Sequence, residues 1–467
     1  MVEEAVILMP EEKLNCLPSY LFAPVAGVPL LQRELFGLWR AGITSVTIMV
    51  PPAAQPDLER HLSQVLKLTE NIKVISDWET LWAQTLNGTK DNPRLAVLAN
   101  ILADPRFLAR LVNYPVPPGK LALGLMESPD PAQGNKDQER AKRISYPVIL
   151  KDGLVTSLGF SDSANGLQAA GLVLFSPTAW QNWQHWQQGH KKPLDSFLSD
   201  PETPLFAYLS QQVRENRVLG VVSDPVYISA IHHDRDRAEA TARLIAAADG
   251  SPLGDGRLET TLNRTMARKL LPWVLASSVT PNQITAASLL LGLVASLGFA
   301  VGTYEASLAA GLLLPLVMVL DCLDGMVARL KFQESGLGAR LDLYGDTILN
   351  LIIFWGIAVG QYRASGHPLF LGLGLLLTLG YLACWWLLDI PEVRHWDPAH
   401  SPLGARLCPS KLKKAGKFLE EAVSRDFFYI ILLGALINCL DYLFIGIAVG
   451  TNVFALFLFK RQRHGQV

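Results

Sequence analysis

From about residue 281 to its end, the chain consists of long apolar runs separated by short polar connections. Most of these runs hold roughly 18 to 22 residues, the length that a helix needs to cross the hydrocarbon core of a bilayer. The pattern predicts six spans, of which the fifth is short: Pro281–Gly302, Ala306–Asp324, Arg340–Gly360, Pro368–Leu388, Phe427–Leu440 and Tyr442–Phe459. We therefore expect residues 281–467 to form an all-α transmembrane domain of six helices.

Residues 1–240 follow a different pattern, in which short apolar runs alternate with helical stretches. The expected strands are Ala5–Met9, Ser45–Val50, Ile72–Ser76 and Arg94–Ala99, and the expected helices include Pro29–Ala41 and Pro56–Leu68. Strands that are apolar throughout and alternate with helices are typical of a parallel sheet covered on both faces. This part of the chain is therefore predicted to be a doubly wound α/β domain. A later hairpin is indicated by Asp152-Gly153, a turn pair between two apolar runs.

Residues 241–280 separate the two patterns. They begin with a turn-rich linker and continue as an amphipathic stretch that carries Arg264, Arg268 and Lys269. A basic amphipathic helix next to a membrane span is typical of a segment that lies along the lipid surface. We expect this segment to lie on the inner leaflet and to couple the two domains.

Positive charges are distributed unevenly among the connections between the spans. If the first span runs outward from the cytoplasm, the outer connections carry one cation, Arg363. The inner side carries the others: Arg264, Arg268, Lys269, Arg329, Lys331, Arg340, Lys411, Lys413, Lys414, Lys417, Lys460, Arg461 and Arg463. The positive-inside rule then places both termini, and the N-terminal domain, in the cytoplasm of a multi-pass inner-membrane protein. The N-terminal sequence MVEEAVILMP agrees, because it has acids where a signal peptide carries positive charge.

The composition excludes several classes of partner and site. The formal net charge of -1 gives nothing that would attract nucleic acid. The five cysteines are scattered, with neither CxxC nor Cys/His metal spacing, which argues against a disulfide framework or a zinc site.

Acidic residues stand at the inner ends of the second and third spans. On a helix, Asp321 and Asp324 are i,i+3 neighbours, and Asp342 and Asp346 are i,i+4 neighbours, so each pair presents two carboxylates from one face. Ionised acids so close together repel one another and are costly near lipid unless a cation neutralises them. Oxygen ligands suit Mg²⁺, Mn²⁺ or Ca²⁺, of which Mg²⁺ or Mn²⁺ fits phosphate transfer best. Alternatively, these aspartates only cap helices or pair with arginine. This explanation is reasonable for any single aspartate, but it does not account for four of them at matching positions.

The segment around these acids resembles the CDP-alcohol phosphotransferase family at every defining position, as Asp321-x2-Asp324-Gly325-x2-Ala328-Arg329-x8-Gly338-x3-Asp342-x3-Asp346. Further similarity comes from Thr280–Thr285 at the start of the first span and from Arg425–Phe428 at the start of the fifth. The resemblance implies a six-helix membrane enzyme, expected to be a homodimer, that moves a substituted phosphate from a CDP-alcohol to an acceptor hydroxyl and releases CMP.

The resemblance also implies roles for single residues. Asp321, Asp324 and Asp342 would hold two divalent ions, Mg²⁺ or Mn²⁺, with Asp346 as a shared ligand or as the base that deprotonates the acceptor. The CDP moiety would lie against Gly325, Ala328, Arg329 and Gly338. Charge alone suggests that Arg425, Lys411 and Lys414 bind an acceptor phosphate, although the run Lys411–Lys417 could equally bind anionic lipid headgroups.

The order of elements in residues 1–240 resembles sugar-phosphate nucleotidyltransferases, and the segment Pro24–Leu31 is similar to one of that family. The chemistry of that family is expected to be lost here. Glu11 and Glu12 stand where a glycine-rich loop would bind a triphosphate, and Tyr20 stands at the position of a lysine. Asn100 and His232 align with expected metal aspartates. The domain is therefore predicted to be catalytically inactive.

Three alternatives remain at this stage. An intramembrane prenyltransferase would also use aspartate-rich helices, but it would need more spans and a second aspartate motif. A membrane-anchored scaffold would bind a nucleotide without turning it over. In the N-terminal domain, Trp180, Trp183 and Trp186 could stack a base, but an aromatic stripe at helical spacing is more often buried in a core.

Overall fold

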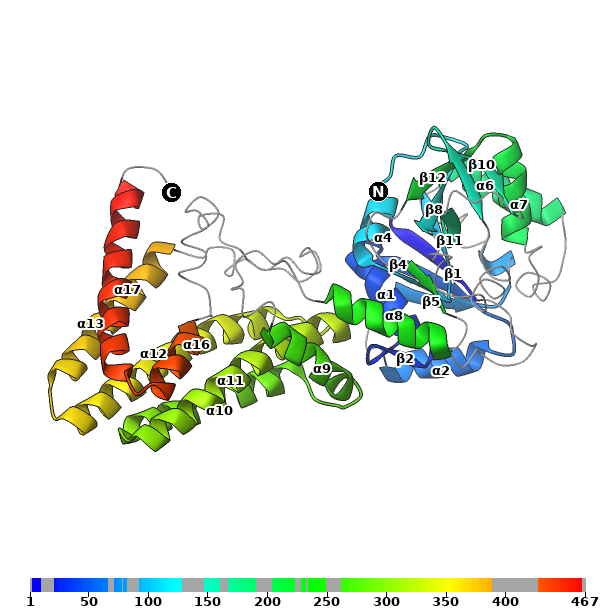
Figure 1. Ribbon diagram of the computed structural model, residues 1–467. Coiled ribbons are helices and arrows are strands. Elements are labelled where there is room, and N and C mark those ends of the chain that lie inside the picture. The colour runs from blue at the N-terminus through cyan, green and yellow to red at the C-terminus, as the bar shows by residue number, and fades with distance from the viewer. Residues whose placement is uncertain are drawn as a thin grey trace, which may run out of the picture. The chain divides into compact units, whose positions relative to one another are not determined.

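The computed structural model describes residues 2–9, 21–65, 71–77, 79–81, 92–127, 147–159, 167–189, 204–222, 228–231, 234–248, 262–388 and 427–463. The chain divides into two compact units, Met1–Leu244 and Ile245–Val467. The first unit is α/β and the second is helical (Figure 1).

The α/β unit is built on a nine-stranded sheet with the order β5-β4-β1-β6-β11-β8-β12-β10-β9. Its strands are β1 (Glu4–Leu8), β4 (Ser45–Met49), β5 (Ile72–Ile75), β6 (Arg94–Leu98), β8 (Leu121–Glu127), β9 (Val148–Lys151), β10 (Leu154–Leu158), β11 (Leu167–Phe175) and β12 (Val218–Val222). Two small sheets pair β2 (Pro24–Val25) with β3 (Val28–Pro29) and β7 (Ile101–Ala103) with β13 (Ile228–Ala230). The helices of the unit are α1 (Leu30–Arg40), α2 (Gln55–Val65), α4 (Pro105–Val112), α6 (Pro177–Gly189), α7 (Pro204–Arg214) and α8 (Asp234–Ala247). Helix α8 extends beyond Leu244, the last residue of the unit.

The four strands expected from the sequence form the parallel half of this sheet, since β4, β1 and β6 pair in parallel and β5 pairs in parallel with β4. The prediction of a wholly parallel sheet was wrong. The strand β11 runs antiparallel to both β6 and β8, and β10 runs antiparallel to β12 and β9. The expected hairpin is the pair β9 and β10, and its turn residues Asp152 and Gly153 have φ angles of 51° and 78°. Two consecutive residues with positive φ are typical of the turn that matches the twist of paired strands.

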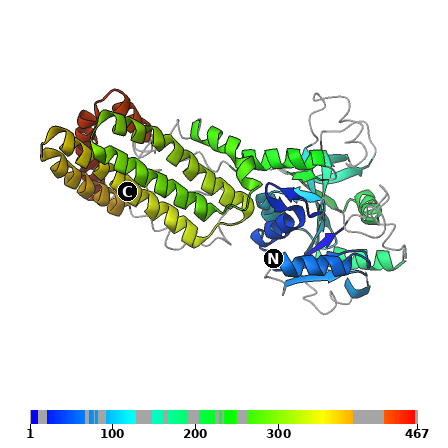
Figure 2. The ribbon, with the colours of Figure 1, turned by 90° about the horizontal axis from the view of Figure 1, so that it is seen from below.

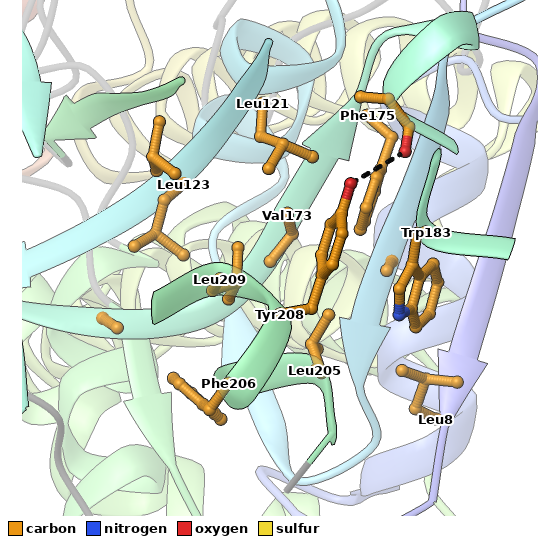
Figure 3. Close-up of a cluster of buried hydrophobic side chains, with 14 of the residues drawn as sticks. Leu8, Leu121, Leu123, Val173, Phe175, Trp183, Leu205, Phe206, Tyr208 and Leu209 are labelled. Carbon is orange, nitrogen blue, oxygen red and sulfur yellow. Dashed lines mark hydrogen bonds between the residues drawn. The ribbon is translucent and has the colours of Figure 1, made fainter. Parts of the chain in front are cut away.

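Helices cover both faces of this sheet, and β8 shows how. Leu121 and Leu123 are fully buried in a cluster with residues of α6 and α7 (Figure 3). Gly124 points to the opposite face, where a Cβ would lie 3.2 Å from the ring of Phe107 in α4. Because successive side chains of a strand alternate between faces, the two helix layers pack on opposite sides.

The tryptophan stripe of α6 belongs to the first of these layers. Trp180 and Trp183 are fully buried and pack against Phe175, which confirms core packing as the role of these two rings. Tyr208 of α7 lies in the same cluster and donates a hydrogen bond to the carbonyl of Ala179 at 3.3 Å (Figure 3). Burial raises the pKa of Tyr208 to about 12, so the hydroxyl keeps its proton.

The helical unit contains α9 (Arg264–Leu275), α10 (Pro281–Val301), α11 (Tyr304–Lys331), α12 (Gly336–Ser365), α13 (Leu369–Leu388), α16 (Phe427–Leu436) and α17 (Leu440–Arg463). Among the described residues, four helices are long and apolar enough to cross a membrane: α10, α11, α12 and α17. Two shorter apolar segments, Leu369–Cys384 and Phe427–Leu436, lie at the expected fourth and fifth spans. The long helices of this unit lie side by side (Figure 2).

Helices α10 and α12 approach each other closely at two glycines. A Cβ at Gly356 would lie 2.4 Å from the carbonyl oxygen of Ser296, and one at Gly360 would lie 2.0 Å from that of Phe299. The Ser296 hydroxyl also donates to the carbonyl of Ile352 at 2.6 Å. Small residues four apart permit this backbone contact between membrane helices, so α12 is fixed against α10 at this level.

Candidate metal centre

Three of the four predicted aspartates meet about two to three turns away from the connection between α11 and α12. Asp321 and Asp324 lie near the end of α11, and Asp342 lies near the start of α12. One carboxylate oxygen from each of these residues lies within 4.8 Å of the other two. Asp324 is buried, whereas Asp321 and Asp342 are half-buried. The structure therefore brings together an acidic trio, Asp321, Asp324 and Asp342, from two helices.

The connection between these helices is short because each end is capped locally. Phe332 ends α11 with a φ of 56°, and the N–H of Gln333 donates to the carbonyl of Ala328 at 2.9 Å. Ser335 begins α12, and its hydroxyl accepts from the N–H of Gly338 at 2.9 Å. Left-handed C-caps and serine N-caps satisfy backbone groups that a helix end leaves open. Residues 332–335 thus connect the two helices, and both helices pack on α10.

Helix α10 supplies a further polar group to the trio. The hydroxyl of Thr285 donates to a carboxylate oxygen of Asp324 at 2.5 Å and lies 3.2 Å from the carbonyl of Pro281. The start of α10 is fixed by a capping box between Thr280 and Gln283, which places Thr285 in the second turn. Thr285 was part of the segment that suggested the family resemblance, but its contact with Asp324 was not predicted.

Arg329 lies over Gly325. A Cβ at Gly325 would lie 3.3 Å from a terminal nitrogen of the Arg329 guanidinium, so the absence of a side chain leaves room for that group. The Nε atom of Arg329 donates to the carbonyl of Ala248 at 3.0 Å. Arg329 is half-buried and five residues beyond Asp324 on the same helix, which places a positive charge at the edge of the acidic trio.

Gly338 marks a second close approach. A Cβ there would lie 3.0 Å from the hydroxyl of Ser335 and 3.3 Å from the side-chain oxygen of Asn282, at the start of α10. Ala328, whose carbonyl helps to end α11, is half-buried on the same helix as the acids. Small residues at these positions let the helix ends meet near the trio.

Asp346 lies one turn beyond Asp342 on α12 and is half-buried. Among the described residues, the acids whose carboxylate oxygens all lie within 4.8 Å of one another are those of the trio. Asp346 does not belong to this group. In α13, Tyr381 receives a hydrogen bond from Asn350 at 3.0 Å and lies within electrostatic range of Asp346. The predicted acceptor residues Arg425, Lys411 and Lys414 lie outside the described residues.

The trio fits a hard divalent cation. Three carboxylates held this close repel one another, and the burial of Asp324 makes that repulsion more costly. All of the offered atoms are oxygens, the ligands that Mg²⁺ and Mn²⁺ prefer. The Thr285 hydroxyl orients Asp324 as an outer partner orients a metal ligand. The arrangement can hold cations and, through them, bind and activate a substrate with several phosphate oxygens.

Comparison with known proteins gives a match for this region of the chain. Residues 278–399 match the family model described as CDP-alcohol phosphatidyltransferase, and this range includes the trio, Thr285, Arg329 and Asp346. The chain is 31% identical over 139 residues to the bifunctional IPC transferase and DIPP synthase of Thermococcus kodakarensis, which is 30% of this chain and 30% of that protein. It is 37% identical over 82 residues to the archaetidylinositol phosphate synthase of Pyrococcus horikoshii, which is 18% of this chain and 42% of that protein.

A comparison of structures matches 52% of the chain to a solved inositol-1-phosphate CTP transferase from T. maritima. The match covers 96% of that chain, with 12% identity and a TM-score of 0.40. The matched segments of the sequence relatives span less than half of those proteins. The family match is confined to the helical unit and coincides with the acidic trio that the resemblance predicted. The part of the helical unit that holds the trio, residues 278–399, therefore matches the CDP-alcohol phosphatidyltransferase family.

Proposed function

We propose that this protein is a divalent-metal-dependent CDP-alcohol phosphotransferase, which transfers a substituted phosphate from a CDP-alcohol to an acceptor hydroxyl and releases CMP. One observation carries the proposal: the three acids of the family-matched segment come from two helices and place their oxygens within 4.8 Å of one another. A cluster of this kind is suited to bind a divalent cation, and a diphosphate is a natural ligand for that cation.

Each residue of the site has a proposed role. Asp321, Asp324 and Asp342 hold two ions of Mg²⁺ or Mn²⁺, and Thr285 keeps the Asp324 carboxylate in one orientation. Asp346, one turn along α12, takes the proton of the acceptor hydroxyl or shares a metal. When bound, the ions would draw charge from the diphosphate and stabilise the attacking and leaving oxygens.

The CDP moiety lies along the small residues of α11. Arg329 extends over Gly325, where its forked guanidinium is placed to bind a phosphate of the donor. Ala328 and Gly338 leave space for the cytidine at the meeting point of the helix ends. A guanidinium that leaves the carbonyl of Ala248 for a phosphate gains a charge-assisted hydrogen bond in exchange for a neutral one.

The donor is proposed to be a lipid-borne CDP-alcohol, so that the product is a phospholipid. An apolar groove of about 410 Å³ lies between α10 and α12, and its lining includes Ile348, Ile352 and Trp355. Ile348 is two residues beyond Asp346, so the groove continues from the acidic end of α12 along the span. A groove lined in this way suits an acyl chain whose headgroup reacts at the trio.

The acceptor is proposed to be an alcohol phosphate of the inositol phosphate class. The printed name of the Pyrococcus horikoshii relative, archaetidylinositol phosphate synthase, supports this choice. Arg425, Lys411 and Lys414 are the proposed ligands of the acceptor phosphate, because cationic side chains bind phosphate through charge-assisted hydrogen bonds.

We further propose that the helical unit spans the inner membrane six times as a homodimer, with the acids, both termini and the α/β unit on the cytoplasmic side. The four long apolar helices and the two shorter ones supply the six segments. The excess of Lys and Arg on one set of connections supplies the orientation. Cysteine labelling from either side of sealed vesicles tests this orientation.

The decisive experiment is turnover by the purified protein in liposomes. CDP-diacylglycerol, or another lipid-linked CDP-alcohol, is supplied with Mg²⁺ and a panel of alcohols and alcohol phosphates, and CMP and lipid products are measured by mass spectrometry. We expect CMP release that depends on both metal and acceptor. Metal-dependent binding of the donor without CMP release across the panel would favour the scaffold alternative. Transfer of a prenyl group from a prenyl diphosphate would favour the prenyltransferase alternative.

The α/β unit is proposed to be catalytically inactive. Asn100 is buried between β6 and β7, where an acid would be needed to hold a metal in the suggested alignment. The other substituted positions, Glu11, Glu12, Tyr20 and His232, lie outside the described residues. The unit instead supports the membrane domain or binds a ligand without converting it.

A further inference from the structure

Polar residues continue along α12 beyond the acids. Asp342, Asp346 and Asn350 are spaced four residues apart, so they lie on one side of the helix over about two turns. All three are half-buried. Four residues further on stands Phe354, which is buried. We call Asp342, Asp346 and Asn350 the polar face of α12. It ends at Asn350, about 12 Å from Asp342 along the helix axis.

Tyr381 of α13 meets the polar face of α12 at this end. The side-chain amide of Asn350 donates to the Tyr381 hydroxyl at 3.0 Å. Tyr381 also interacts with the side chain of Thr347 and with the charge of Asp346. A tyrosine hydroxyl can accept one hydrogen bond and donate another, so the bond from Asn350 does not use the Tyr381 proton. Helix α13 thus adds a hydroxyl group one turn beyond Asp346.

Aromatic rings bound the polar face of α12 beyond Asn350. Phe354 lies edge-on to Tyr381, with ring centroids 6.4 Å apart, and stacks on Phe427 of α16, with ring centroids 5.6 Å apart. Phe354 is part of the buried apolar cluster of the helical unit, and Phe427 packs against that cluster. A ligand that extends past Asp346 into the helical unit would therefore meet Asn350 and Tyr381 before it meets apolar rings.

A hydrogen bond between two membrane helices can also serve only to hold them together. The same two helices contain such a bond, because the indole N–H of Trp355 donates to the Thr378 hydroxyl at 3.1 Å. The Thr378 hydroxyl in turn donates to the carbonyl of Gly374 in its own helix at 2.8 Å. Trp355 is nine residues beyond Asp346, whereas Asn350 is four residues beyond it. The two bonds therefore join the same helices at different distances from the reacting groups.

We propose that Asn350 and Tyr381 bind the acceptor and select one that carries further hydroxyl groups beside the reacting hydroxyl. This inference rests on the proposed function, in which Asp346 takes the proton of the acceptor. Asn350 lies one helical turn, about 6 Å along the axis, from Asp346, a distance that a ring bearing several hydroxyls can span. The Tyr381 hydroxyl donates to such a hydroxyl, and the carbonyl oxygen of the Asn350 side chain accepts from it. The acceptor class is thus a polyol or cyclitol phosphate.

The test uses the purified full-length protein in liposomes with CDP-diacylglycerol and Mg²⁺. Initial rates of CMP release are measured against the concentration of inositol 1-phosphate, of its analogues that each lack one hydroxyl, and of alcohols with a single hydroxyl. The variants are Tyr381→Phe and Asn350→Ala. Thr378→Val is the matched control, because it removes the other hydrogen bond between the same helices. Thermal unfolding in detergent shows whether each variant is folded.

We expect Tyr381→Phe to raise the KM for inositol 1-phosphate about 3- to 10-fold, the loss of one hydrogen bond, with kcat and the KM for CDP-diacylglycerol nearly unchanged. Asn350→Ala should act in the same direction, and Thr378→Val should leave the acceptor KM as it is. A site built to bind a hydroxyl rejects an analogue that lacks it. The wild type should therefore discriminate against one deoxy analogue, and Tyr381→Phe should lose that discrimination.

Two results would overturn this inference while leaving the proposed function in place. One is an acceptor KM that Tyr381→Phe does not change, or that Thr378→Val raises equally. The other is a preference of the wild type for alcohols with a single hydroxyl. Absence of CMP release by the wild type with every acceptor would instead refute the proposed function, and this inference with it.

Discussion

Glu34 in the α/β unit and Asp324 in the helical unit are both carboxylic acids that are only 5% exposed, yet their surroundings differ. Burial raises the pKa of Glu34 well above its ordinary value, against a smaller opposing effect of the Ile101 backbone. Burial therefore favours the protonated form of Glu34. Asp324 lies among two further acids and accepts a hydrogen bond from Thr285, an arrangement that fits a divalent cation. The comparison teaches that burial of an acid does not by itself mark chemistry, whereas convergence of acids from separate elements does.

The largest effect should come from breaking the acidic trio. We expect Asp324→Ala to lower CMP release by at least about 10² to 10³-fold, the loss that follows removal of one group that stabilises a transition state. Glu305→Ala is the matched control, because it removes an acid from the first turn of the same helix. Turnover assays in liposomes check both variants. Undiminished turnover in Asp324→Ala would falsify the role of the trio.

Divalent cations should be needed for turnover and should also stabilise the helical unit. Chelation by EDTA should abolish CMP release, and Mg²⁺ or Mn²⁺ should restore it. A ligand that binds only the folded state at 100 times its Kd stabilises by about 2.7 kcal/mol. Mg²⁺ should therefore raise the unfolding temperature of the wild-type helical unit and leave that of Asp324→Asn nearly unchanged. An equal rise in both proteins would show that the metal binds elsewhere.

The contact between Thr285 and Asp324 should give an intermediate effect. Thr285→Val keeps the shape of the side chain but removes the hydroxyl, and we expect about 10- to 100-fold weaker metal activation, as for other partners of metal ligands. Thr285→Ser retains the hydroxyl and should recover most of the loss. The concentration of Mg²⁺ at half-maximal CMP release is the measurement. If the valine and serine variants behave alike, the hydrogen bond is not what matters at this position.

Glu34 should affect stability without affecting turnover. Because its folded pKa is raised, the folded state binds more protons than the unfolded state above the ordinary pKa of 4.5. The stability of the α/β unit should therefore fall as the pH rises from 4.5 towards the raised pKa. Glu34→Gln should remove this slope and be more stable than the wild type at neutral pH. Unfolding midpoints measured across this pH range test this prediction, and Glu79→Gln is the control because it makes the same change at an exposed glutamate of the same unit. A slope that persists in Glu34→Gln would have to come from another group.

The last prediction is that the α/β unit has no nucleotidyltransferase activity. The α/β unit should release no pyrophosphate from CTP with any sugar or inositol phosphate if, as proposed, Asn100 and His232 stand where nucleotidyl transfer needs metal-binding acids. Pyrophosphate release by the full-length protein is the measurement, and turnover well above a no-enzyme control would show that the unit retains catalysis.

Sequence patterns predicted most of the local elements. Continuous apolar runs located β1, β4, β5 and β6, and the turn pair Asp152-Gly153 located the hairpin. The antiparallel strand β11 was missed, because its apolar run cannot be told from a buried helix or from a parallel strand by periodicity alone. Its direction depends on pairing with β6 and β8, which are distant in sequence.

At the candidate site, too, some features were predictable from the sequence and others were not. The i,i+3 pair Asp321 and Asp324 was predicted to approach Asp342 because the spacing of charges in an apolar segment is visible in the chain. Thr285 was not assigned a role, since a single hydroxyl on an apolar helix gives no periodic signal. Its partner is 39 residues away, and only the packing of α10 on α11 brings the two together.

The contact of Gly356 and Gly360 with α10 has a mechanical consequence for the distant acids. These glycines hold α12 against α10 about three to four turns from Asp346. A tilt of α12 about this contact would therefore move Asp342 relative to Asp324. A methyl group at Gly356 would clash with the carbonyl oxygen of Ser296 and force the two helices apart at this contact. The spacing of the three acids is thus linked to a helix contact at Ser296 and Gly356 that also lines the proposed acyl-chain groove.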